Sequence, residues 1–231
     1  AFSDSIMNAM YMNNPRGRFI NAENIGKADY ETMLKLYKER FANAGKFVFT
    51  IVGNVNPEEF KPLAEQYIAS IPGYAEKSTF NPNAIKARKG KFDNHFTRAL
   101  EAPKASSAIV FSGKMKYNLQ NSIQLDALKQ VLDIQLMEKI REKLGGTYGV
   151  QVMAEQEKEP FEGFTIQMQF DTEPNRRVEL VNAINKAVTE LQKNGPKAEE
   201  VQKIKECMTR QHADELKKNE NTLSSLNKQD R

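Results

Sequence analysis

The stretch REKLGGTYGV, residues 141–150, decides how the second half of this chain folds. Arg141 stands in what the apolar spacing predicts to be the last turn of a helix, and two glycines then break that helix. Tyr148 follows at once and opens a run that alternates like a strand. The chain therefore reverses from a helix into a strand, and this reversal brings positions 141 and 148 to the same edge of a sheet.

The residues around this reversal predict a mixed α+β fold. A wide apolar stripe predicts a long helix over 121–144, and alternating runs on either side of a polar turn predict an antiparallel hairpin. Helical spacing continues from Pro174 to about Asn194, and a charged, weakly amphipathic segment follows. We expect an antiparallel sheet covered by helices. The segments that carry this prediction are strands at 96–100, 107–111, 148–155 and 164–170, the helix from Pro174, and the segment 197–226.

The first part of the chain predicts a helix, a strand and a second helix. Asp29 is a candidate N-cap for a helix over 29–45, and Asn56 with Pro57 opens another that ends at Pro72-Gly73. Between them, FVFTIV at 47–52 is β-branched and aromatic, which is typical of a strand. Residues 74–91, rich in Pro, Asn, Gly and Lys, read as a linker.

Composition excludes several classes of function. The chain has 34 Lys and Arg against 30 Asp and Glu, a net charge of +4 that is well mixed, so it does not predict nucleic-acid binding. The basic run 86–91 lacks interleaved aromatic residues and reads as a solvated linker rather than a phosphate-binding patch. Cys207 is the single cysteine, which excludes an internal disulfide. No apolar run approaches the roughly 18 residues of a membrane span. The chain starts at Ala1 within a plausible helix, so we expect it to be part of a longer protein.

The sequence shows no complete catalytic apparatus. The two histidines, His95 and His212, are too far apart to pair by local spacing. His212 opens the segment HADEL, which is one residue short of the inverted zinc motif H-x-x-E-H because Leu216 stands where the second histidine belongs. Serine and cysteine nucleophile motifs are also missing from the sequence. We therefore predict neither a catalytic residue nor a metal ligand within this chain.

Two interpretations of Arg141 and Tyr148 remain open at this point. In the first, Lys139, Arg141 and Lys143 only oppose the partial negative charge of the helix C-terminus, and Tyr148 is a core residue of the strand. In the second, the guanidinium and the phenol lie side by side and grip peptide carbonyls or an oxyanion.

REKLGGTYGV resembles the arginine–tyrosine motif in the C-terminal half of the pitrilysin/insulinase family of zinc peptidases, and is most similar to bacterial members. A second resemblance lies upstream, where FVFTIVGNVNPEEFKPLAEQYIASIPG, residues 47–73, is similar to the strand–glycine–acidic helix that closes one structural repeat of that family. The two segments occur in the family's order, and the resemblance extends over residues 25–215.

The resemblance implies a function for the chain. Family members close two halves over an unfolded peptide, and the N-terminal half binds zinc through H-x-x-E-H and a distant glutamate. Zinc would then be bound outside this chain, which would be inactive alone. Its partners would be a peptide substrate and the zinc-binding half, and Arg141 and Tyr148 would bind the substrate backbone. The alternative is a non-catalytic structural or binding subunit with the same fold. A bacterial location follows, either periplasmic or cytoplasmic.

The resemblance also implies a division of the chain. Residues 1–73 would be the C-terminal part of one α/β repeat, 74–91 a linker, and 92–231 the N-terminal part of the next repeat. We expect the segment 29–71 to dock where the second repeat lacks its own tail, which would make a permuted pseudo-repeat. The same docking between two copies would give a homodimer by exchange of segments.

Overall fold

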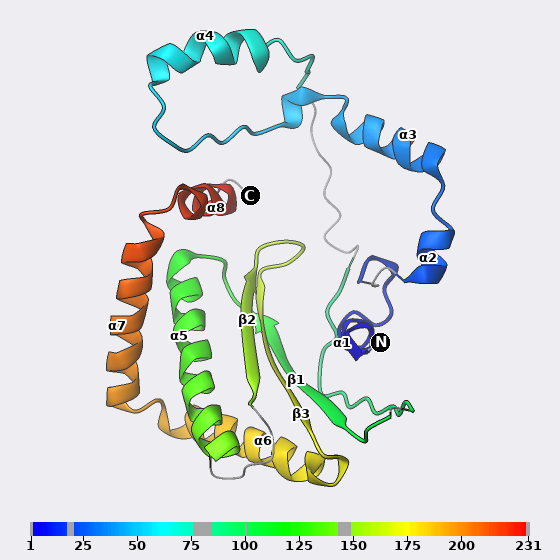
Figure 1. The fold of residues 1–231 in the computed structure, drawn as a ribbon, viewed down its shortest axis with the longest axis vertical. Coiled ribbons are helices and arrows are strands. Elements are labelled where there is room, and N and C mark those ends of the chain that lie inside the picture. Colours follow the sequence, from blue (N-terminus) through cyan, green and yellow to red (C-terminus); the bar gives the residue numbers. More distant parts are fainter. Residues whose placement is uncertain (1, 18–20, 76–84, 100, 143–148, 230–231) are drawn as a thin grey trace. The chain divides into compact units, whose positions relative to one another are not determined.

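The computed structural model describes residues 2–17, 21–75, 85–99, 101–142 and 149–229 (Figure 1). The chain divides into two compact units. One consists of Ala1–Phe19 and Asn81–Cys207, and the other of Ile20–Phe80 and Met208–Arg231. The predicted α+β class is confirmed, since the described residues form helices and one small antiparallel sheet.

The sheet of the first unit has three antiparallel strands in the order β1-β3-β2. They are β1 (Ala105–Lys114), β2 (Gln151–Glu157) and β3 (Gly163–Thr172). Met168 of the central strand pairs with Ile109 on one side and Val152 on the other. Ile166, Met168 and Phe170 alternate along β3 and are all buried, so one face of the sheet belongs to the core. The predicted hairpin and the strand at 107–111 are therefore confirmed.

Helices complete this core. They are α5 (Leu119–Leu136), which runs directly into a π-helical turn η3 (Met137–Glu142), α6 (Arg177–Asn194), preceded by the turn η4 (Pro174–Arg176), and α7 (Ala198–Glu215). The Asn118 side chain accepts the backbone N–H of Asn121 at 2.8 Å and starts α5. Gly195, with φ of 71°, ends α6. Among the described residues, every buried apolar side chain lies between Leu125 and Ile204.

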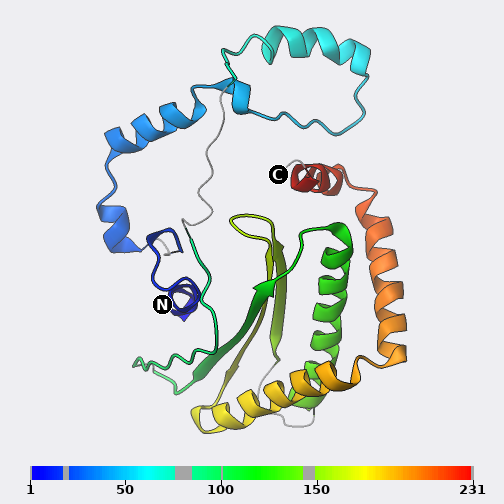
Figure 2. The same cartoon turned by 180° about the vertical axis from the view of Figure 1, so that it is seen from behind.

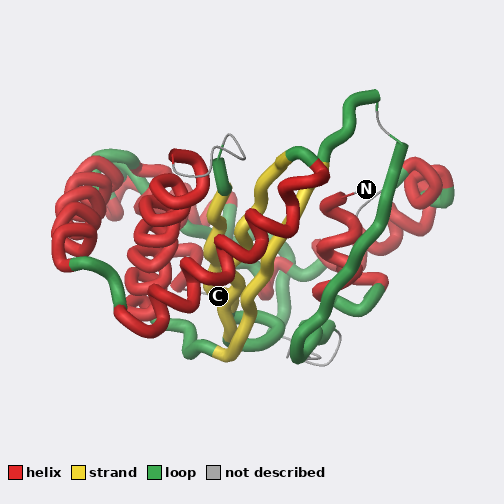
Figure 3. Tube along the Cα trace, turned by 90° about the horizontal axis from the view of Figure 1, so that it is seen from below, coloured by secondary structure: helices red, strands yellow, loops and turns green. Residues whose placement is uncertain are grey.

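One helix lies across an end of the sheet. Figures 1 and 3 show α6 running across the strands at the end where α5 stops and β2 begins. In Figures 1 and 2 the short helix α1 (Phe2–Met10) lies on the other side of the strands from α5. A 3-10 turn η1 (Pro15–Gly17) follows α1.

Arg88 attaches the end of α1 to the segment that leads into β1. Its Nε donates to the carbonyl of Ala9 and its backbone N–H to the carbonyl of Met10, both at 2.7 Å. Its guanidinium also lies over the ring of Phe92, 3.8 Å from the centroid. Within the run 86–91, Arg88 therefore makes specific contacts with α1 and with Phe92.

The second unit contains α2 (Ala22–Gly26), α3 (Tyr30–Phe41), a 3-10 turn η2 (Ala44–Lys46), α4 (Pro57–Tyr67) and α8 (Asn219–Gln229). The predicted caps are confirmed: Asp29 accepts the backbone N–H of Thr32 at 2.8 Å, and Asn56 accepts that of Glu58 at 3.1 Å. Asn43 is buried, and its side-chain oxygen accepts the backbone N–H groups of Gly45 and Tyr74, which closes residues 43–74 into a loop.

Two predicted strands are not formed. Residues 47–52 belong to no strand, and the same holds for 96–99, while Leu100 lies outside the described residues. An extended run becomes a strand only when a neighbouring strand satisfies its backbone N–H and C=O groups. The composition of FVFTIV favours a strand but could not supply that neighbour. Phe47, Phe49 and Ile51 are accordingly exposed.

Candidate functional site

The helix end and the strand that flank the predicted reversal are present in the structure, and the two glycines between them lie outside the described residues. The π-helical turn that ends α5 reaches Glu142, and β2 begins at Gln151. Arg141 lies in that turn, but its side chain is outside the described residues, and so is the whole of Tyr148. The placement of the guanidinium beside the phenol therefore stays a prediction.

The helix end that carries Arg141 is firmly anchored. Leu136 and Ile140, four residues apart, are both 0% exposed. Between them, Lys139 Nζ donates a hydrogen bond to Glu190 Oε2 of α6 at 2.6 Å. This hydrogen bond, more than the positive charge itself, holds the pKa of Glu190 below its ordinary value. Lys139 thus has a specific partner on another helix, which the helix-dipole interpretation did not include.

A second tie holds the same end of α5. The carboxylate of Glu200, which is 7% exposed, accepts from Gln135 Nε2 and from the backbone N–H of Lys197, both at 3.0 Å. The bond to Lys197 caps the start of α7, and the bond to Gln135 joins α7 to α5. A buried carboxylate costs stability unless it is hydrogen-bonded, and Glu200 has two donors. Sequence reasoning missed this residue because a capping box is recognised by Ser or Thr three residues before the Glu, and Lys197 stands there instead.

A pair of carboxylates lies at the other end of β2. Burial raises the pKa of Glu157, and the neighbouring charge of Glu155 raises it further. Burial likewise raises the pKa of Tyr11, and both glutamates add to that effect. The i, i+2 spacing of the two glutamates on one face of a strand was visible in the sequence, but the approach of Tyr11 from a distant segment was not.

The described residues do not provide a zinc site. They contain no group of three His, Cys, Asp or Glu side chains that could hold a metal ion. In HADEL, His212 and Glu215 are exposed, and Leu216 is 67% exposed at the position of the missing ligand. The binding of zinc outside this chain remains an expectation from the family.

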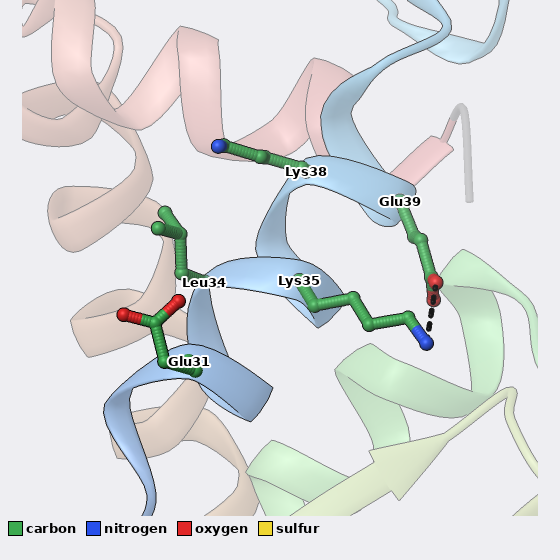
Figure 4. Close-up of a pocket in the computed structure, with 5 residues that line it drawn as sticks. All are labelled: Glu31, Leu34, Lys35, Lys38 and Glu39. Atoms are coloured by element: carbon green, nitrogen blue, oxygen red, sulfur yellow. Dashed lines mark ion pairs between the residues drawn. The ribbon is translucent and has the colours of Figure 1, made fainter.

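A shallow hollow on α3 has no evident chemistry. It is lined by side chains of that one helix, Glu31, Leu34, Lys35, Lys38 and Glu39 (Figure 4). Lys35 and Glu39 form an ion pair of 3.9 Å across one helical turn, which is an ordinary arrangement on a solvated helix surface.

Comparison with known families identifies the fold. The family model described as "Peptidase M16 inactive domain" matches residues 27–208, which include the motif at 141–150. The chain belongs to the peptidase M16 inactive-domain family. The predicted resemblance to zinc peptidases is thereby confirmed, because the M16 domain is found in proteins that are named zinc proteases.

Individual proteins resemble the chain in sequence or in fold. This M16 domain is 25% identical over 188 residues to a probable zinc protease PqqL of Haemophilus influenzae, an alignment that covers 77% of the chain and 20% of that protein. The crystal structure of the periplasmic protease PqqL from Escherichia coli matches 96% of the chain and 24% of its own length, with 19% identity and a TM-score of 0.80. The ferredoxin protease FusC, solved as a mutant in complex with Arabidopsis ferredoxin, matches 97% of the chain and 24% of its own length, with 16% identity and a TM-score of 0.75.

The chain therefore spans about a fifth of the Haemophilus protein. It corresponds to the M16 domain that the family description calls inactive, and a protein with a similar domain is named a probable zinc protease. None of the helices in the described ranges is long and apolar enough to cross a membrane.

Proposed function

We propose that this M16 inactive domain is the substrate-binding portion of a zinc metalloendopeptidase and that Arg141 and Tyr148 grip the backbone of an extended peptide. The observation that supports this best is the helix end at Glu142, which carries the backbone of Arg141 and precedes the predicted reversal into β2 at Gln151. The ends of this reversal are fixed by buried side chains on α5 and by the ladder with β3. Residues that bind a substrate must be held in place by rigid elements of this kind.

The chemistry of the two side chains fits a peptide backbone. A guanidinium donates two parallel hydrogen bonds to carbonyl or carboxylate oxygens and is always charged, so Arg141 would orient the peptide. The phenol of Tyr148 would donate a hydrogen bond to the oxygen that gains negative charge when a peptide bond is attacked. Zinc, held in the N-terminal half of the intact protein, would supply the activated water. The partners of the domain are then that half and a peptide or unfolded polypeptide.

One set of substitutions separates this proposal from the helix-dipole interpretation. Arg141→Lys keeps the positive charge at the helix end but loses the guanidinium fork. We expect Arg141→Lys and Tyr148→Phe each to weaken binding of a fluorescein-labelled unstructured peptide about tenfold, with an unchanged melting temperature. In the protein with both halves, kcat/KM should fall by a similar factor. If Arg141→Lys binds peptide like wild type while Arg141→Ala lowers the melting temperature, the residue serves only the helix.

The exposed apolar surface of residues 20–74 supports a second role, docking. Neither α3 nor α4 has a buried residue, and large apolar side chains of this segment are exposed, among them Tyr30, Met33, Tyr37, Phe41, Val48, Phe49, Leu63 and Tyr67. Such a concentration on a small segment is typical of an interaction surface. We propose that residues 1–73 and 92–231 belong to consecutive repeats joined by residues 74–91. We further propose that residues 47–52 become a strand when they dock on the sheet within 92–170, either of the same chain or of a second copy.

The docking proposal has a direct test. Val48→Lys and Phe49→Lys should each lower the helix content of residues 20–74 if the segment docks within one chain, and should abolish self-association if two copies exchange it. Size-exclusion chromatography with light scattering distinguishes the two versions. Unchanged helix content and mass in both variants would refute both versions of the docking.

For the location of the protein, we propose the periplasm or the cytoplasm of a bacterium. Detection of the chain in the fraction released by osmotic shock would decide between them.

A further inference from the structure

The end of α5 departs from regular helical geometry just before Arg141. The helix continues as a π-helical turn over Met137–Glu142, in which hydrogen bonds reach one residue further than in an α-helix. A wider turn changes the face on which the following residues are presented. Turns of this kind occur frequently at functional sites, because they re-aim a side chain without ending the helix.

Two contacts connect this turn to the rest of its unit. On its inner side, Leu136 and Ile140 are fully buried and hold the turn to the core. On its outer side, the ion pair of Lys139 Nζ with Glu190 Oε2, 2.6 Å long, ties the turn to α6. The two side chains are 34% and 44% exposed, so the pair lies at the surface rather than in the core. An exposed ion pair contributes little to overall stability, but it can still select one orientation of a turn.

We infer that Lys139 and Glu190 are positioning residues that orient the π-helical turn so that Arg141 is presented to the peptide. This inference rests on the proposed function of Arg141 and adds to it a pair of residues that do not touch substrate. It assigns different tasks to two cations only two positions apart: Lys139 binds Glu190, and Arg141 binds the peptide.

The test compares Lys139→Met and Glu190→Gln with a matched control in the complete chain. Lys129→Met is that control, because Lys129 forms an ion pair of 2.9 Å with Asp133 on the same helix and both side chains are 35% exposed. We expect Lys139→Met and Glu190→Gln to weaken binding of one fluorescein-labelled synthetic peptide without secondary structure by about three- to tenfold, and Lys129→Met to have no effect. Melting temperatures of the three variants should be alike.

Two further measurements separate positioning from a general structural role. In a double-mutant cycle, adding Lys139→Met to Arg141→Ala should weaken binding no further, since the pair acts through Arg141. The exchanged pair Lys139→Glu with Glu190→Lys should restore binding. The NMR signal of the Arg141 Nε–H group, assigned with Arg141→Lys, should shift on addition of peptide to wild type and shift less in Lys139→Met.

Each result bears on one of the two proposals. If Arg141→Ala binds the peptide like wild type, the proposed function fails and this inference fails with it. If Arg141→Ala weakens binding but Lys139→Met and Glu190→Gln do not, the proposed function stands and the positioning role is overturned. The positioning role would also be overturned if Lys139→Met and the Lys129→Met control weakened peptide binding equally. The same holds if the losses of binding in Lys139→Met and Arg141→Ala were additive.

Discussion

Replacing Ile140 by alanine tests whether the turn that carries Arg141 is anchored as the structure indicates. Ile140 is 0% exposed, so the substitution removes three buried carbon groups, worth about 0.8 kcal/mol each, and leaves a cavity. We expect the free energy of unfolding to fall by about 3 kcal/mol. Ile134, on the same helix, is 39% exposed, and Ile134→Ala leaves a space that water can fill, so its loss should be about 1 kcal/mol.

Urea unfolding followed by circular dichroism measures this difference. With a denaturant slope of about 2 kcal/mol per M, the midpoint of Ile140→Ala should lie about 1 M below that of Ile134→Ala. The slopes should agree with that of wild type, which would show that both variants unfold from the same compact state. Equal midpoints for the two variants would refute the packing of the π-helical turn, and the rigid mount proposed for Arg141 would lose its basis.

Three other predictions follow from single contacts. Burial raises the pKa of Glu157 above its ordinary value of 4.5, so the charge of this residue costs stability once the pH rises through that raised pKa. Glu157→Gln should therefore raise the melting temperature at about pH 7 and not at about pH 3. An equal rise at both pH values would contradict this prediction. Arg88→Ala should speed hydrogen exchange of the amides in α1, measured by NMR, whereas the exposed Lys89→Ala should not. Gly73→Ala should lower the helix content of the second unit by circular dichroism, since a Cβ there would lie 2.4 Å from the backbone nitrogen of Gly45, while Gly26→Ala, where a Cβ meets nothing within 4 Å, should not.

Local signals in the sequence predicted the helices and the hairpin well. The caps Asp29, Asn56 and Gly195 mark where helices begin or end because each satisfies backbone groups within its own few residues. The alternation in 164–170 predicted β3, since its buried face repeats every second residue. Such features depend only on residues that are close in sequence, so they can be predicted from the sequence.

What the sequence could not show depends on residues that are far apart in it. The π-helical turn at 137–142 interrupts a helix predicted to run regularly to 144, and the apolar spacing around Leu136 and Ile140 gives no sign of it. The pairing of Lys139 with Glu190 spans 51 positions, and that of Gln135 with Glu200 spans 65. Nor does the composition of FVFTIV at 47–52 reveal whether a partner strand is within reach.

The cluster of cations at the end of α5 shows how these two kinds of information combine. A helix dipole favours any positive charge in the last turn, so by this criterion Lys139 and Arg141 are equivalent. In the structure Lys139 has a carboxylate partner on α6, which the helix dipole alone does not predict. A lysine suits a single point contact, whereas a guanidinium suits the two parallel hydrogen bonds of a peptide or carboxylate. A lysine at position 139 thus matches the single contact with Glu190, and an arginine at position 141 fits the peptide-binding role proposed above.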